Sequence, residues 1–305
     1  EDLSVIIECK EYLTSQINAS KWGAQPLSFG LSTTSIDAGE NNAMRDAGFR
    51  IIGDNIPSDT SSPSWAIERS GGSLEQNVAT ISAIQEGIEL NGYANLYWEA
   101  QIEDLNVRRD RDVLEWIESQ DYWFTTWGEW YSSTHSAIES ERTDQSITLK
   151  GSASSNGGWD VPGTTHLTLD GGQITSIERL DDGELTELTL ATHHLETGYR
   201  MIDDSSVTLT IDEGALVRVT WQGEDAEVHF GEGTFNNLTP FMAVGHHTTD
   251  LFEWSSPFQH SPLRFTWLIE PQPDIEPSWI LPMIAILVIL VVPAAIRHTL
   301  RHDRE

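Results

Sequence analysis

Residues 121–130 read Asp-Tyr-Trp-Phe-Thr-Thr-Trp-Gly-Glu-Trp, an aromatic run followed by a segment that suits a helix. The run predicts a strand over 122–125 and a helix over 129–138. The preceding sequence repeats this alternation, with strands expected at 26–30, 49–52 and 93–98 and helices at 3–17, 41–47, 74–90 and 110–119. Alternating strands and helices predict a parallel sheet with helices packed against it. We therefore expect an α/β domain over residues 1–140, as part of a distorted (β/α) barrel.

From residue 143 onward the pattern changes to short strands separated by turns rich in Asp and Gly. Strands are expected at 164–169, 173–180, 185–192, 207–211, 216–221, 226–230 and 264–269. The turns Asp170-Gly171-Gly172 and Asp212-Glu213-Gly214 are typical of hairpins, in which the two joined strands pair with each other. Short strands at this spacing predict an all-β, antiparallel sandwich over residues 141–270.

Residues 277–296 carry no charged side chain, although the chain has a formal net charge of −31. A helix over this stretch would be about 30 Å long, which matches the hydrocarbon core of a bilayer. Basic residues follow it, and such residues close to a span favour the cytoplasmic side. We therefore expect an anchor in the cell membrane with the body extracellular, the alternative being a buried core helix. Its parts are a Pro-rich spacer at 271–278, one C-terminal transmembrane helix at 279–296 and a cytoplasmic basic tail at 297–305.

The composition of the chain indicates which partners and which kind of habitat to expect. It contains 48 Asp and Glu against 17 Lys and Arg, a balance that resembles proteins from salty habitats. Such an acidic body repels phosphates, so we expect no nucleic-acid partner. Cys9 is the single cysteine, so no intrachain disulfide can form. The chain starts at Glu1 without a Met or an apolar signal sequence, which predicts a fragment or a processed form of a longer protein.

Two segments resemble the later part of the polysaccharide deacetylase family, which shares the NodB homology domain. The first is Leu27-Ser28-Phe29-Gly30, then Asp37, then residues 42–50, which end in Ala47-Gly48-Phe49-Arg50. In that family a strand leads to an Arg-x-Pro-Tyr-Gly-like loop and then to a helix that ends in Gly-Phe. The second segment is 121–130, which is similar to the family's last strand and following helix. The resemblance covers about residues 1–135 and implies hydrolytic removal of N- or O-acyl groups from a polysaccharide.

The resemblance also implies a cofactor, a divalent metal such as zinc. The family holds the metal through an Asp and two His in motifs that would precede Glu1. His135 is the only histidine between Glu1 and Ile138. The loop expected to carry Arg and Pro reads Phe29-Gly30-Leu31-Ser32, and the strand expected to carry a His reads Leu96-Tyr97-Trp98-Glu99. The chain is therefore expected to be either the C-terminal portion of an active enzyme or a related fold that has lost the chemistry.

Glu99 is the candidate catalytic residue. It follows a predicted strand and has Glu103 and Asp104 downstream. Paired carboxylates serve glycoside hydrolysis as acid and nucleophile. The alternative is that these acids are solvated residues of an acidic surface.

Trp98, Trp127 and Trp130 are the candidate substrate-binding residues, because indole faces stack on sugar rings. Core packing is the alternative for most of this aromatic cluster. No metal ligand is assigned. The paired histidines His193-His194 and His246-His247 would have to combine across strands, because neighbouring residues of a strand point to opposite faces.

The leading prediction is a membrane-anchored, extracellular, carbohydrate-active protein, a polysaccharide deacetylase-like hydrolase. Its expected partners are the membrane and a polysaccharide or glycoprotein glycan. The first alternative is a non-catalytic cell-surface adhesin or glycan-binding envelope protein. The second alternative is a glycosidase that uses Glu99.

Overall fold

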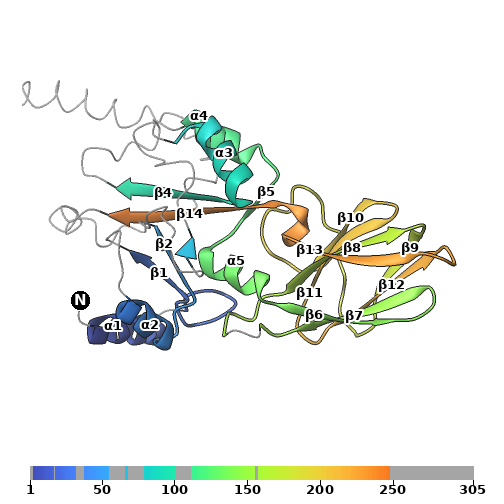
Figure 1. The fold of residues 1–305 in the computed structure, drawn as a ribbon, viewed down its shortest axis with the longest axis horizontal. Helices are drawn as coiled ribbons and strands as arrows, with labels where there is room; N and C mark the ends of the chain where they lie inside the picture. The colour runs from blue at the N-terminus through green and yellow to red at the C-terminus, as the bar shows by residue number, and fades with distance from the viewer. Residues whose placement is uncertain are drawn as a thin grey trace, which may run out of the picture. The chain divides into compact units, whose positions relative to one another are not determined.

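The computed structural model describes residues 3–16, 18–31, 38–54, 66–67, 79–100, 111–154 and 157–247. Within these ranges the strands form two parallel sheets of three strands and two antiparallel sheets of four (Figure 1). Helices are few and short, and the longest of the described ones is the N-terminal helix α1. The described part of the chain is therefore mainly β structure.

The first parallel sheet joins β1 (Ser28–Leu31), β2 (Ile51–Asp54) and β3 (Ala66–Ile67). Helices α1 (Leu3–Gln16) and α2 (Ala38–Asp46) come before and between these strands. Met44, Phe49 and Ile52 form a small core here, and Ile6 of α1 packs against it. Lys10 Nζ donates a hydrogen bond of 2.7 Å to the carbonyl of Ala47, which satisfies a backbone group at the end of α2.

The second parallel sheet has the order β4-β14-β5, with β4 at Ala94–Ala100, β14 at Thr239–His247 and β5 at Tyr122–Phe124. Figure 1 shows β14, in orange, beside β4. Helix α3 (Ile81–Asn91) begins at its N-cap Thr80 and ends at Gly92, whose φ of 74° suits glycine. Helix α4 (Arg111–Glu118) precedes β5, and the apolar faces of both helices belong to the same core as Leu96 and Tyr122.

The antiparallel sheets form a sandwich. One sheet has the order β6-β7-β12-β9 and the other the order β10-β11-β8-β13. The strands are β6 (Ala137–Arg142), β7 (Ser146–Ser152), β8 (Gly163–Asp170), β9 (Gln173–Arg179), β10 (Gly198–Asp203), β11 (Ser206–Ile211), β12 (Leu216–Gln222) and β13 (Glu227–Glu232). Alternate residues of β7, β8 and β12 are buried, and they meet in one core that includes Leu149, Leu167 and Val217. This alternation is what a two-sheet sandwich requires.

The sandwich interrupts the parallel sheet along the chain. Helix α5 (Trp127–Thr134) follows β5, and the chain then runs through the whole sandwich before η2 (Phe235–Asn237) leads into β14. β14 pairs with β4 on one side and β5 on the other, both in parallel. We expected residues 239–247 to belong to the sandwich, but they form the middle strand of the second parallel sheet.

The predicted fold class is wrong. We expected a partial (β/α) barrel, a sandwich and a transmembrane helix, but the described residues are mostly strands in small sheets with few helices. The parallel strands divide between two separate sheets of three. The prediction failed at β14. The pairing between residues 94 and 241 joins segments far apart in the chain, and it leaves no local pattern in the sequence from which it could be predicted.

Both predicted hairpins are also wrong, although strands flank their turns. The Asp170–Gly172 turn joins β8 to β9, and the Asp212–Gly214 turn joins β11 to β12, but each pair is divided between the two sheets. The turns therefore cross from one sheet to the other. The expected strand at 185–192 is a turn region with one isolated bridge, and the expected strand at 264–269 lies outside the described residues.

The expected membrane anchor is corrected as well. Among the described residues, no helix is both long enough and apolar enough to cross a membrane. The predicted span at 279–296, its spacer and its tail lie outside those residues. The prediction of a membrane-anchored protein, with an extracellular body and a cytoplasmic C-terminus, is not carried further.

Candidate functional site

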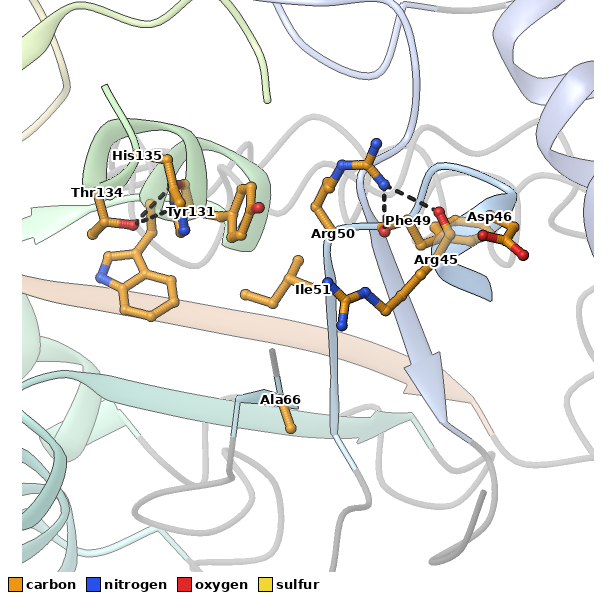
Figure 2. Close-up of a pocket in the computed structure, with 10 residues that line it drawn as sticks. Arg45, Asp46, Phe49, Arg50, Ile51, Ala66, Tyr131, Thr134 and His135 are labelled. Atoms are coloured by element: carbon orange, nitrogen blue, oxygen red, sulfur yellow. Dashed lines mark hydrogen bonds between the residues drawn. The ribbon is translucent and has the colours of Figure 1, made fainter. Parts of the chain in front are cut away.

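A pocket of about 570 Å³ opens between α2, β2 and α5 (Figure 2). This volume lies within the range of small-molecule sites. One wall comes from α2 and the loop after it, and the other from α5. The lining residues are Arg45, Asp46, Phe49, Arg50, Ile51, Ala66, Trp130, Tyr131, Thr134 and His135.

The helix α5 supplies an aromatic wall. Thr126 caps the helix by accepting a hydrogen bond of 3.2 Å from the backbone N–H of Glu129. The Tyr131 and His135 rings stack with centroids 4.1 Å apart and an interplanar angle of 27°. His135 Nδ1 lies 2.8 Å from the carbonyl oxygen of Tyr131, so in the neutral ring Nδ1 carries the proton and Nε2 is an acceptor. The wall thus combines ring faces with a polar group.

The opposite wall carries two guanidinium groups. Arg45 lies in the last turn of α2, and Arg50 lies just before β2. Arg50 Nη1 donates to the carbonyl oxygens of Phe49, at 3.0 Å, and Arg45, at 3.2 Å. Figure 2 shows these two bonds, with the Arg45 side chain extended beside Ile51. Among the described residues of the lining, Asp46 supplies the one carboxylate.

Two of the predicted sugar-binding tryptophans have different surroundings. Trp130 is partly buried, lines the pocket, and packs against Tyr93 with ring centroids 5.4 Å apart. Trp127 is only 7% exposed, and its indole N–H donates a hydrogen bond of 2.8 Å to the buried Asn95 side chain. Trp127 is therefore a core residue that ties α5 to β4.

Trp98 and Glu99 lie near the end of β4, where the structure describes the backbone. In the register with β14, Trp98 pairs with Gly245 and Glu99 with His246. The carboxyl ends of neighbouring parallel strands are common ligand sites. The side chains of Trp98 and Glu99, and the whole of Glu103 and Asp104, lie outside the described part of the structure.

The two histidine pairs lie at opposite ends of β14. The rings of His193 and His194 lie 5.6 and 6.1 Å from the Phe124 ring, and Phe124 pairs with Phe241. His246 is farther along the strand, at a distance of about 16 Å from Phe241 at the usual rise per residue. The backbone positions of the two pairs are therefore far apart along the strand.

The described residues offer no donor set for the metal that the deacetylase resemblance implies. In the described ranges, no three His, Cys, Asp or Glu side chains gather closely enough to hold an ion. A catalytic zinc needs about three protein ligands. We therefore derive no step that passes through a metal.

Glu129 is a chemically distinctive residue that we did not predict from the sequence. It accepts hydrogen bonds from Trp22 Nε1, at 3.1 Å, and from Thr125 Oγ1, at 3.3 Å. Burial raises the pKa of the Glu129 carboxyl, while these hydrogen bonds and the nearby Lys21 partly oppose the shift. The spacing Thr126-x-x-Glu129 is a capping-box signal that marks the true start of α5, two residues before the predicted start at Glu129.

We expect Glu129→Gln to raise the free energy of unfolding, relative to the unsubstituted protein, more at pH 7 than at pH 4. Because the folded-state pKa is raised, the Glu129 contribution is fully present below the unfolded pKa and is lost as pH rises through the folded pKa. Glutamine keeps an acceptor for Trp22 without the charge. Urea unfolding of both proteins at pH 4 and pH 7 measures this, and a difference in unfolding free energy that stays constant between the two pH values would contradict it.

Comparison of the chain with protein-family models, with curated proteins and with solved structures gives no match. The resemblance to polysaccharide deacetylases therefore stays a prediction. The residues of the pocket carry the functional argument.

Proposed function

We propose that this protein binds a glycan in the pocket between α2, β2 and α5. The observation that carries the proposal is the combination of a ring-lined wall with charged and polar groups in one open pocket of about 570 Å³. Sugar rings have one apolar face and a rim of hydroxyls, so they suit a site in which aromatic faces lie beside hydrogen-bonding groups. Trp130 and Tyr131 supply the faces.

The polar groups of the pocket match a hydroxyl-rich ligand. Thr134 and His135 lie together at the end of α5, with Thr134 Oγ1 3.2 Å from His135 Nδ1. In the neutral ring, Nε2 of His135 can accept a hydrogen bond from a hydroxyl, and the guanidinium groups on the opposite wall can donate a hydrogen bond to one. Donors and acceptors on facing walls would fix the orientation of a sugar.

This proposal follows the non-catalytic alternative of the sequence analysis. Deacetylation needs a metal, and we derive no step for it from the described residues. The glycosidase alternative uses Glu99, whose side chain lies outside the described part of the structure. Binding is therefore the function that the described geometry supports best.

We expect Trp130→Ala to weaken glycan binding by about tenfold, because it removes one stacking face. Screening the full chain on a glycan array and titrating the best oligosaccharide by calorimetry measures the effect. Phe230→Ala is the matched control, because Phe230 is 47% exposed on β13 and does not line the pocket. Unchanged affinity in Trp130→Ala, with normal thermal unfolding, would refute binding at this pocket.

A further inference from the structure

The turn at residues 20–23 is fastened to helix α5 through the carboxyl group of Glu129. Trp22 Nε1 donates a hydrogen bond of 3.1 Å to Glu129 Oε2. Thr125 Oγ1 donates to the other carboxyl oxygen, at 3.3 Å. Both donors are neutral groups, and the Glu129 side chain is partly buried between them. The contact therefore places a titratable group between two segments that are far apart in the sequence.

The two fastened segments support opposite walls of the pocket. The backbone N–H groups of Arg50 and Ile51 donate to the carbonyl oxygen of Leu27, at 2.8 and 3.2 Å. The chain that follows the turn therefore supports the wall formed by β2. Helix α5 carries the other wall, where Trp130 is the next residue after the carboxyl group. The hydrogen bond between the turn and α5 thus joins the supports of the two walls.

The turn also carries the charged group that acts on the carboxyl. Lys21 favours the ionised form of Glu129 by its positive charge. Its Nζ lies 4.4 Å from the centre of the Trp22 ring and donates 3.4 Å to the carbonyl oxygen of Leu195. The other titratable groups on α5 and on the neighbouring segments 121–125, 157–162 and 189–195 are Tyr131, Asp121, Tyr122, Asp160, His193 and His194.

Ionisation of the carboxyl and packing of the turn oppose each other. Burial raises the pKa of the Glu129 carboxyl, and the hydrogen bonds and Lys21 offset only part of this shift. The packed state therefore binds the proton more tightly than a state in which the turn has moved away and water reaches the carboxyl. By linkage, the packing is strongest below the unfolded-state pKa and weakens as pH rises through the folded-state pKa.

The turn is the partner that we expect to move. It is a short surface segment that closes on itself through the bridge between Ser20 and Gly23, and Lys21 at its tip is exposed. Helix α5 is instead anchored by the buried Trp127, whose indole N–H donates to Asn95. Local opening starts in segments that have few buried contacts.

We propose that Trp22 and Glu129 form a pH-sensitive clasp, which holds the supports of the two pocket walls together while the carboxyl is protonated and releases the 20–23 turn as the carboxyl ionises. Glu129 is thus a positioning residue that acts on the pocket through α5 and the turn. The clasp goes beyond the proposed function, because it is a property of the fold that holds whether or not the pocket binds a glycan.

Hydrogen exchange of the indole N–H groups, followed by nuclear magnetic resonance of the full chain between pH 4 and pH 8, tests the clasp. The protection of the Trp22 N–H is compared at each pH with that of Trp127, which is bonded to Asn95. We expect the protection of Trp22 relative to Trp127 to fall about tenfold as pH rises, because the open turn becomes more populated. In Glu129→Gln the ratio should stay constant, because glutamine accepts the same hydrogen bond and does not ionise.

Glu141→Gln is the matched control, because Glu141 is exposed on β6 and its substitution should leave the pH dependence intact. If Glu129→Gln disturbs folding, Lys21→Gln decides the matter. It removes the charge that favours the ionised carboxyl, so the fall in protection should move to higher pH. A constant ratio in the unsubstituted chain, the same fall in Glu129→Gln, or a fall at an unchanged pH in Lys21→Gln would each overturn the clasp.

Discussion

Trp159→Ala is expected to lower the free energy of unfolding by about 4 kcal/mol, the typical cost of removing a large aromatic side chain from a core. Trp159 is 8% exposed and belongs to the core that joins the N-terminal segment to α5 and the start of the sandwich. Its indole N–H donates 2.8 Å to the carbonyl of Gln25, and its backbone N–H donates 2.8 Å to Ser132 Oγ.

The packing around Trp159 depends on two glycines. A Cβ at Gly128 would lie 2.5 Å from the Trp159 ring, and one at Gly23 would also collide with it. The indole therefore fills a slot shaped by missing side chains on α5 and on the 20–23 turn. Surrounding atoms cannot close such a slot fully when the ring is removed, so a cavity remains and adds to the cost.

Urea unfolding of Trp159→Ala and Trp159→Phe separates packing from hydrogen bonding. Phenylalanine keeps most of the ring contact and loses the bond to Gln25, so we expect a loss of about 1–2 kcal/mol. A loss below about 1 kcal/mol for the alanine variant would contradict the packing described for this core.

Asn236→Ala is expected to lower the free energy of unfolding by about 3 kcal/mol. Asn236 is 1% exposed and lies in η2, the segment that returns the chain from the sandwich to β14. Its Nδ2 donates to the carbonyl oxygens of Thr189, at 2.7 Å, and Thr192, at 3.2 Å. Its Oδ1 accepts a bond of 2.9 Å from Arg200 Nε. Alanine would leave these partly buried groups without that partner.

Asn237→Ala is the control for this prediction. Both residues have a φ of 53°, a left-handed conformation that favours asparagine over alanine. Asn237 is exposed, so its substitution measures the conformational cost alone, which we expect to be about 1 kcal/mol. Equal losses for the two variants in thermal unfolding would show that the hydrogen bonds of Asn236 contribute nothing.

Local sequence patterns predicted individual elements better than their arrangement. The amphipathic segment at 110–119 corresponds to α4, and the aromatic run at 122–125 corresponds to β5. The pairing of the strands was not predicted correctly, because it depends on residues that lie far apart in the sequence. The Asp-Gly turns fix a reversal of the chain, but burial decides whether the next strand stays in the same sheet. Every residue of β11 is buried, so both faces of this strand are covered. The strands that pair with it along its edges are β8 and β10.

The candidate site could be predicted only in part. Trp130 was chosen because indole faces stack on sugar rings, and it lines the pocket. Arg45 and Arg50 belong to the stretch that carries the family resemblance, but nothing in their spacing indicates that α5 lies opposite. Arg50 and Tyr131 are far apart in the sequence, and the packing of α5 against β2 brings them into one pocket. Only the three-dimensional structure reveals this packing.

Binding at the pocket is tested most directly by nuclear magnetic resonance of the indole N–H groups while the best oligosaccharide from the glycan array is added to the full chain. The account predicts that the Trp130 signal shifts with ligand concentration, whereas the buried Trp159 and Trp221 signals stay in place. Shifts confined to the sandwich tryptophan Trp221, or no shift at Trp130 under conditions in which the ligand binds, would contradict it.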